Sequence, residues 1–191
     1  ADALERGYMQ LKRYDDAIIL LQGRITKNPS DITAYAQLGT VYIRKSDEPK
    51  ALETWEQVIA QDPKRETPYR VVANTMIENR LFDRAIAVYK RGRTACADPA
   101  LFTNDLAYLY SMTLRYQEAT SEYLNSIRQN PSQLTYVQLQ IARYTGRTEG
   151  LASATLVVEQ AVRAEERNLS FRQLLAWLAM EGKRFDQAFE L

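Results

Sequence analysis

The chain has 191 residues, of which 46% are hydrophobic and 26% are charged, a balance typical of a folded, soluble protein. Its net charge is only +1, so it lacks the basic excess of most nucleic-acid binders, and no apolar run approaches the ~18 residues of a membrane-spanning helix. The absence of histidine excludes histidine-based catalysis and metal ligation, and the single cysteine, Cys96, excludes an intramolecular disulfide.

The elements predicted in chain order are pairs of helices, and residues 32–65 show the pattern best. A first helical stretch is expected over about 33–45. The break at 46–49, with the sequence SDEP, offers side chains that accept from the free amides of the next helix and a proline that fits its first turn. The second stretch ends before Asp62-Pro63, because the residue before a proline is disfavoured in the α region.

Small residues recur along the chain at a nearly constant interval. The recurring alanines are Ala17, Ala51, Ala85, Ala119, Ala154 and Ala188, with gaps of 34, 34, 34, 35 and 34 residues. Large apolar residues keep the same step four positions later, at Leu21, Trp55, Tyr89, Tyr123 and Val158. A period of this length that holds two helices predicts stacked helix pairs, each of which buries its apolar face only against its neighbours.

These residues resemble the tetratricopeptide repeat, whose period is 34 residues and whose pattern is W-x2-L-G-x2-Y, A-x3-F and P. The best-matched unit, 32–65, carries Tyr35, Leu38, Gly39, Tyr42, Ala51, Trp55 and Pro63 at those places. The unit 134–168 is irregular, because Gln140-Ile141 replaces Leu-Gly, the closing proline is missing, and one residue is inserted near Gly150.

The resemblance implies an all-α, right-handed superhelical solenoid of about five to six antiparallel helix pairs. We expect one solenoid over 1–191 with units at 1–31 (partial), 32–65, 66–99, 100–133, 134–168 (irregular) and 169–191 (partial). In this family the first helix of each pair lines a concave groove. The chain is therefore expected to be a protein-binding scaffold that holds an extended peptide or a helix of another protein in that groove.

The candidate partner-binding residues are polar or aromatic positions on the expected first helices. They are Gln37, Thr40, Arg44, Arg70, Asn74, Asn104, Tyr108, Gln138, Gln173 and Trp177. Side-chain amides can donate to and accept from a peptide backbone at the same time. Tyr108 and Trp177 offer the large amphipathic surface found at interface hot spots.

Two alternatives stay open. One is a helical-repeat RNA-binding module, against which the near-neutral charge argues. The other is a structural or self-assembling spacer that uses uncapped ends of the solenoid. No catalytic motif, cofactor or metal site is expected, and we expect neither nucleic acid nor a membrane span. No signal peptide is visible, and the compartment is not predicted.

Gly39 raises a separate question, because glycine inside a helix costs about 1 kcal/mol relative to alanine. The same place in other units holds Ala73, Ala107 and Ala176, so the place requires a small residue rather than glycine itself. This favours close approach of the paired helix near Ala51 over a phosphate-binding loop. We therefore expect Gly39→Ala to be nearly neutral or slightly stabilising, and Gly39→Leu to destabilise by overpacking.

Overall fold

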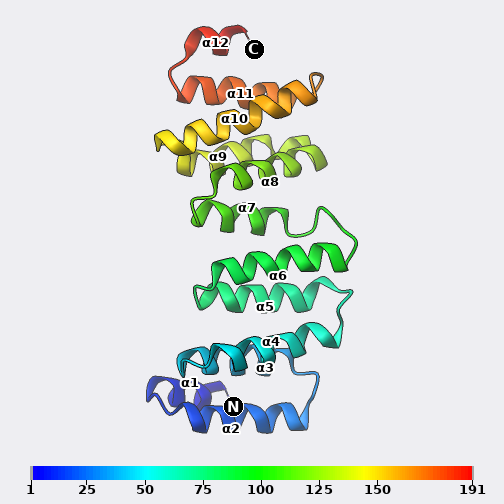
Figure 1. Ribbon diagram of the computed structural model, residues 1–191, viewed down its shortest axis with the longest axis vertical. Helices are drawn as coiled ribbons and strands as arrows, with labels where there is room; N and C mark the ends of the chain where they lie inside the picture. The colour runs from blue at the N-terminus through cyan, green and yellow to red at the C-terminus, as the bar shows by residue number, and fades with distance from the viewer. Residues whose placement is uncertain (1, 191) are drawn as a thin grey trace. The chain divides into compact units, whose positions relative to one another are not determined.

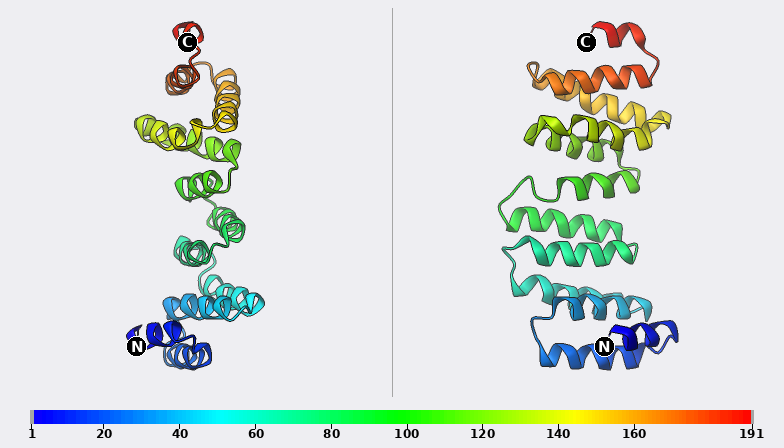
Figure 2. Two further views of the ribbon diagram at one scale, coloured as in Figure 1. Left: turned by 90° about the vertical axis from the view of Figure 1, so that its left-hand side faces the viewer. Right: turned by 180° about the vertical axis from the view of Figure 1, so that it is seen from behind.

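The computed structural model describes residues 2–190, which form helices joined by short turns and contain no strand in that range (Figure 1). The elements in chain order are α1 (Asp2–Gln10), α2 (Tyr14–Lys27), α3 (Ile32–Arg44), α4 (Glu48–Gln61), α5 (Glu66–Glu78), α6 (Phe82–Ala95), α7 (Thr103–Met112), α8 (Tyr116–Gln129), the 3₁₀ turn η1 (Pro131–Gln133), α9 (Leu134–Thr145), α10 (Thr148–Ala164), α11 (Leu169–Glu181) and α12 (Phe185–Glu190). Successive helices pair by short connections, as Figure 2 shows from two further sides. The predicted all-α fold of antiparallel helix pairs is confirmed.

The chain divides into two compact units, residues 1–101 and residues 102–191. The N-terminal unit holds α1 to α6, and the C-terminal unit holds α7 to α12. Every helix pair lies inside the residue range expected for one repeat. A single continuous solenoid over the whole chain stays a prediction.

Short polar side chains begin several of the helices, as the sequence indicates. Asp31 Oδ1 accepts a hydrogen bond from the amide of Ala34 at 3.0 Å at the start of α3. Asp47 accepts from the amide of Lys50 at 3.3 Å at the start of α4. Each bond satisfies a backbone donor that has no partner within its own helix. Within the SDEP break, Asp47 is thus the residue that caps α4.

The turn from the first to the second helix of a pair has one recurring backbone conformation. It places a residue in the left-handed region, with φ between 56° and 64°, at Lys12, Ser46, Arg80, Leu114 and Lys183. The first four of these follow one another at intervals of 34 residues, so the turn is part of the repeat. The following amide bonds back into the first helix; Leu81 N, for example, donates to Met76 O at 2.8 Å. This is the αL ending that usually uses glycine, yet no glycine stands at these places.

The irregular pair α9 and α10 is joined differently. Its turn lacks the left-handed residue, since Gly146 has a φ of −63°. Gly150 is buried, and a Cβ on it would overlap the backbone carbonyl of Tyr144. Tyr144 also stacks on Tyr116, with 4.9 Å between ring centroids, and its hydroxyl lies 2.9 Å from Thr120 Oγ1. The inserted residue is thus accommodated by a tight turn against a buried tyrosine pair.

Gly39 lies directly under the side chain of Trp55. A Cβ added to Gly39 would overlap the indole ring, with Cδ1 only 2.7 Å away. Trp55 is fully buried, and its Nε1 donates to the carbonyl oxygen of Ala36 at 3.2 Å. The packing interpretation of Gly39 is supported, but the contact is with Trp55 rather than near Ala51.

The expectation that Gly39→Ala would be nearly neutral is therefore wrong. The comparison with Ala73 and Ala107 overlooked the partner residue. Those alanines belong to repeats whose second helix carries Tyr89 or Tyr123, whereas the repeat with glycine carries tryptophan. The small residue of the first helix and the aromatic residue of the second helix therefore change together between repeats. Glycine is paired with tryptophan, and alanine is paired with tyrosine.

We predict that Gly39→Ala lowers the free energy of unfolding by about 1–3 kcal/mol, because the added methyl group overpacks the Trp55 contact. Adding Trp55→Tyr should recover part of the loss, since the double variant recreates the alanine–tyrosine pair of the next repeat. A double-mutant cycle in urea measures the coupling. Strictly additive losses would contradict the account.

A second prediction concerns the left-handed turn. Arg80→Gly should raise the free energy of unfolding by about 0.5–1 kcal/mol, because relief of left-handed strain exceeds the entropy that glycine adds to the unfolded chain. The control is Ala87→Gly at an exposed position inside α6, which should destabilise by about 1 kcal/mol. Thermal melts of both variants test the prediction, and equal losses would refute it.

Candidate functional site

A groove of about 440 Å³ lies on the first-helix side of the N-terminal unit, formed by α1, α3 and α5. We call it the first-helix groove. Its lining consists of Glu5, Thr33, Ala36, Gln37, Thr40, Val71, Asn74, Thr75 and Glu78. Three of the predicted binding residues, Gln37, Thr40 and Asn74, lie in this lining.

The two amide side chains of the groove are held in defined orientations by neighbouring helices. Arg24 Nη1 of α2 donates to Gln37 Oε1 at 3.0 Å. The Tyr89 hydroxyl of α6 donates to Asn74 Oδ1 at 2.8 Å. Both oxygens are thus engaged, and among residues 2–190 neither amide nitrogen has a protein acceptor. Each side chain therefore retains an NH₂ group that can donate to a ligand.

The floor between these amides is also fixed by hydrogen bonds. Asn79 Nδ2 donates to Thr40 Oγ1 at 3.1 Å and to the carbonyl oxygen of Thr75 at 2.8 Å. Thr40 Oγ1 in turn donates to the carbonyl oxygen of Ala36 at 3.3 Å. A polar surface that is already ordered in this way loses little further freedom when a ligand binds.

The charged residues of the groove lining are both acidic. Glu5 is buried, with 7% of its surface exposed, and Glu78 is exposed at the end of α5. No lysine or arginine belongs to the lining that the structure describes. The groove therefore disfavours phosphate and other anions.

The two predicted arginines of this unit lie outside the lining. Arg44 is exposed in the last turn of α3. Arg70 is paired with Glu66, one turn earlier in α5, at 3.8 Å. Both side chains are on the surface, and exposed pairs of this kind contribute little to stability.

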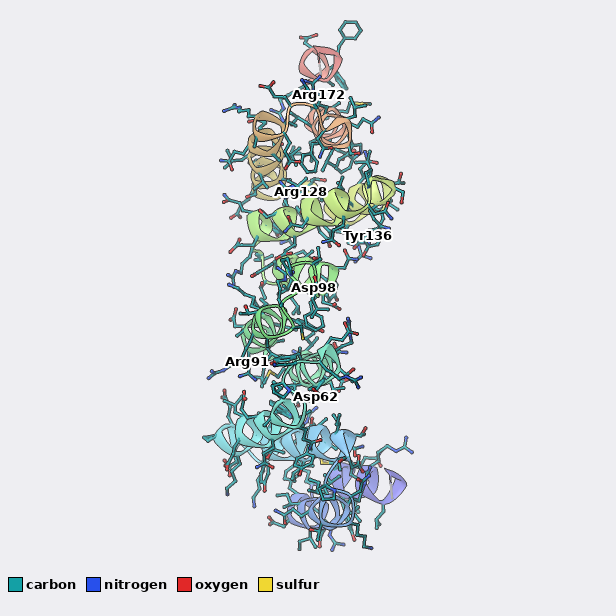
Figure 3. All side chains as sticks on the ribbon, turned by 90° about the vertical axis from the view of Figure 1, so that its right-hand side faces the viewer. Asp62, Arg91, Asp98, Arg128, Tyr136 and Arg172 are labelled. Carbon is teal, nitrogen blue, oxygen red and sulfur yellow. The ribbon has the colours of Figure 1, made fainter. Side chains whose placement is uncertain are left out.

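In the C-terminal unit the first helices present a more apolar surface. Asn104 and Tyr108 are exposed on α7, as is Met112 one turn further on. On α9, Gln138 is partly exposed, and Tyr136, labelled in Figure 3, is 40% exposed. Tyr136 was missed by sequence reasoning.

Tyr136 was missed because of its place in the repeat register. The uninterrupted 34-residue step places it in register with Ala34 and Pro68, both of which are buried. A position that is buried in the regular repeats gave no reason to expect an exposed aromatic ring.

The exposed tyrosines of this unit lie near a buried phenol, that of Tyr123. Burial raises the pKa of Tyr123 to about 12. Its ionisation is further disfavoured by Tyr136 and Tyr108 and favoured by Arg143, so these side chains lie near its hydroxyl. The exposed rings of Tyr108 and Tyr136 thus border the same buried tyrosine.

A family model of the tetratricopeptide repeat matches residues 1–33, which cover α1, α2 and the start of α3. The helix pairs that follow keep nearly the same period, and all except the pair of α9 and α10 keep the same turn. The N-terminal segment thus matches the tetratricopeptide repeat, and the later helix pairs resemble it.

Several solved structures are similar to this chain. PilF of Pseudomonas aeruginosa shares 18% identity over 98% of this chain and 85% of that one, with a TM-score of 0.48. A tetratricopeptide repeat protein of Parabacteroides merdae ATCC 43184 shares 14% identity over 98% and 74%, with a TM-score of 0.49. MamA shares 12% identity over 96% of each chain, with a TM-score of 0.45. No curated protein matches the chain.

Helix α11 holds the two remaining predicted residues. Gln173 is exposed on α11. Trp177 is only partly exposed and packs against the core cluster that includes Leu174 and Leu178. Part of its surface is thus used for packing inside the C-terminal unit.

Within residues 2–190, no three Cys, Asp or Glu side chains are grouped so that they could hold a metal ion. No helix of the same range combines the length and the apolar character needed to cross a bilayer.

The buried tyrosines predict how stability depends on pH. Because burial raises the folded-state pKa of Tyr123 and Tyr144, both hold their protons more tightly in the folded chain than in the unfolded one. The contribution of these phenols to stability should be constant below about pH 10, where they are neutral in both states, and should fall as the pH rises toward about 12. Urea unfolding across this range measures the slope.

Tyr123→Phe is the matched variant, since it removes one of the two phenols. It should reduce the decline of stability above about pH 10, and the decline that remains comes from the other groups with a raised pKa, Tyr144 among them. An unchanged slope in this variant would contradict the burial of the Tyr123 hydroxyl.

Proposed function

We propose that the first-helix groove binds an extended segment of a partner protein. Tetratricopeptide repeats generally serve as non-catalytic scaffolds for protein interactions, and the family match supports such a role here. The observation that carries the specific proposal is the paired orientation of Gln37 and Asn74. Arg24 and Tyr89 engage the amide oxygens, so both NH₂ groups remain as donors.

An extended peptide supplies the matching acceptors, because its backbone carbonyl groups are not engaged in helix hydrogen bonds. Two fixed donors on adjacent repeats can bind two such carbonyl groups along the peptide. Thr33, Ala36 and Val71 supply small or apolar surface for its side chains. The groove therefore recognises main-chain geometry first and side-chain size second.

RNA is a poorer fit to this groove than peptide. A phosphate backbone requires cations, and the lining contains Glu5 and Glu78 with no lysine or arginine among the described residues. This local electrostatic argument adds to the near-neutral net charge of the whole chain.

In the C-terminal unit the proposal extends to the exposed first-helix residues, as separate contacts with a partner. These residues are Asn104, Tyr108, Gln138 and Gln173. Arg44 and Arg70 lie outside the groove lining and Trp177 packs against the core, so the proposal gives these three no binding role.

The decisive variant is Gln37→Glu with Asn74→Asp. Each substitution keeps the oxygen that Arg24 or Tyr89 engages and removes the NH₂ donor. Peptides are first selected for binding to the wild-type chain from a displayed library of random short sequences. Fluorescence anisotropy then measures their affinity for the variant, which should be weaker by about 10-fold or more, because two hydrogen bonds are lost.

The control is Gln117→Glu with Gln129→Glu, which adds the same charge at exposed positions of α8. It should leave the affinity unchanged, and both double variants should melt at the wild-type temperature. The proposal fails if selected peptides bind the groove variant as tightly as the wild type, or if the control weakens binding equally.

A further inference from the structure

Two successive repeat junctions in the N-terminal unit differ on the side formed by the second helices. At the junction of α4 with α6, Arg91 donates two hydrogen bonds to Glu56, at 2.8 Å and 2.9 Å. The guanidinium carbon of Arg91 lies 5.7 Å from the ring centroid of Tyr69. Arg91, labelled in Figure 3, therefore covers this tyrosine and closes the junction.

The tyrosine under this arginine is fully engaged. Tyr69 is only 2% exposed, and its hydroxyl donates to the carbonyl oxygen of Pro63 at 2.8 Å. The guanidinium group of Arg91 lies over the ring of Tyr69, and the hydroxyl of Tyr69 is hydrogen-bonded. Neither the ring nor the hydroxyl of Tyr69 is therefore available to a ligand.

The preceding junction, between α2 and α4, has the same backbone positions but different side chains. Thirty-four residues earlier, Gln57 replaces Arg91, Gln22 replaces Glu56, and Tyr35 replaces Tyr69. A groove of about 560 Å³ lies here, and all three residues line it. We call it the second-helix groove.

Tyr35 in this groove lacks both contacts that engage Tyr69. Its ring is partly exposed, and its hydroxyl bonds to no protein group within residues 2–190. The carbonyl oxygen of Pro29, which corresponds to that of Pro63, accepts from Gln61 Nε2 at 3.1 Å instead. The ring and the hydroxyl of Tyr35 are thus both available from the groove.

We infer that the second-helix groove binds an arginine side chain of a partner protein, placed over Tyr35 as Arg91 is placed over Tyr69. Arginine is the expected bound group because the next repeat fills the equivalent space with Arg91. Gln22 and Gln57 offer amide oxygens to the guanidinium hydrogens, and Glu53 adds a carboxylate to the lining.

The other charged residue of the groove does not compete for this place. Lys50 Nζ is held by Asp47 at 3.0 Å and lies over a different ring, 5.8 Å from the centroid of Tyr42. Lys50 therefore contacts the ring of Tyr42 and leaves the ring of Tyr35 uncovered. Arginine fits better than lysine, because a planar guanidinium stacks on an aromatic ring while it donates in its own plane.

This inference does not depend on the first-helix groove. The two grooves use opposite sides of α3, with Gln37 and Thr40 on one and Tyr35 and Tyr42 on the other. A partner segment can therefore occupy either groove alone.

The test follows Tyr35 by NMR in a chain with ¹³C-labelled tyrosines, assigned with Tyr35→Phe. The probe is the capped tripeptide acetyl-Ala-Arg-Ala-amide, and its control carries citrulline, which keeps the shape and removes the charge. The arginine peptide should shift the Tyr35 ring resonances saturably. The citrulline peptide should bind at least about 3-fold more weakly, because it loses the cation–π contact.

The matched variant is Gln22→Glu with Gln57→Arg, which rebuilds the closed junction of the next repeat. It should abolish the Tyr35 response to the arginine peptide and should melt at or above the wild-type temperature. The control places the same two changes elsewhere, as Gln117→Glu with Gln129→Arg on α8, and should retain the response. Equal shifts with both peptides, no shift with either, or an undiminished response in the closed variant overturns the inference.

Discussion

The indole of Trp55 lies against the backbone of α3, and this contact sets how closely the two helices of that pair approach. Because Gly39 has no side chain, the ring reaches the carbonyl oxygen of Ala36 and donates to it. A helix held so firmly on its packed side presents its opposite side in a fixed register. Gln37 and Thr40 line the first-helix groove from this helix, so the geometry of the groove depends on a contact inside the helix pair.

Contacts between the second and the first helices also orient the polar side chains. A residue of a second helix, Arg24 or Tyr89, bonds to an amide oxygen of a first helix, and the amide nitrogen has no acceptor among the described residues. A free amide could rotate and offer either its oxygen or its nitrogen, whereas a held amide offers one chemistry only. The second helices therefore stabilise the fold and also decide which hydrogen bonds the first-helix groove can make.

The sequence predicts the helix pairs well, because period, prolines and small residues all report backbone requirements that each repeat shares. It also predicts Gln37, Thr40 and Asn74 at the groove, since their register is uninterrupted. It fails where a side chain depends on a specific partner. The tolerance of Gly39 for a methyl group depends on Trp55, and Tyr136 is exposed at a repeat position that is buried at Ala34 and Pro68. Neither property can be predicted from the residues that the other repeats carry at the equivalent position.

The contrast between Arg91 and Gln57 shows why such averages conceal binding surfaces. Both residues are exposed positions on second helices, where a sequence pattern imposes no apolar requirement. In one repeat the arginine neutralises Glu56 and covers a tyrosine; in the preceding repeat two glutamines leave the corresponding tyrosine in an open groove. The backbone supports either arrangement, because neighbouring repeats bury their core without this contact. A repeat fold can therefore exchange an internal cation–aromatic contact for an external one at little cost to its stability, and comparison between its own repeats identifies the chemistry of the missing group.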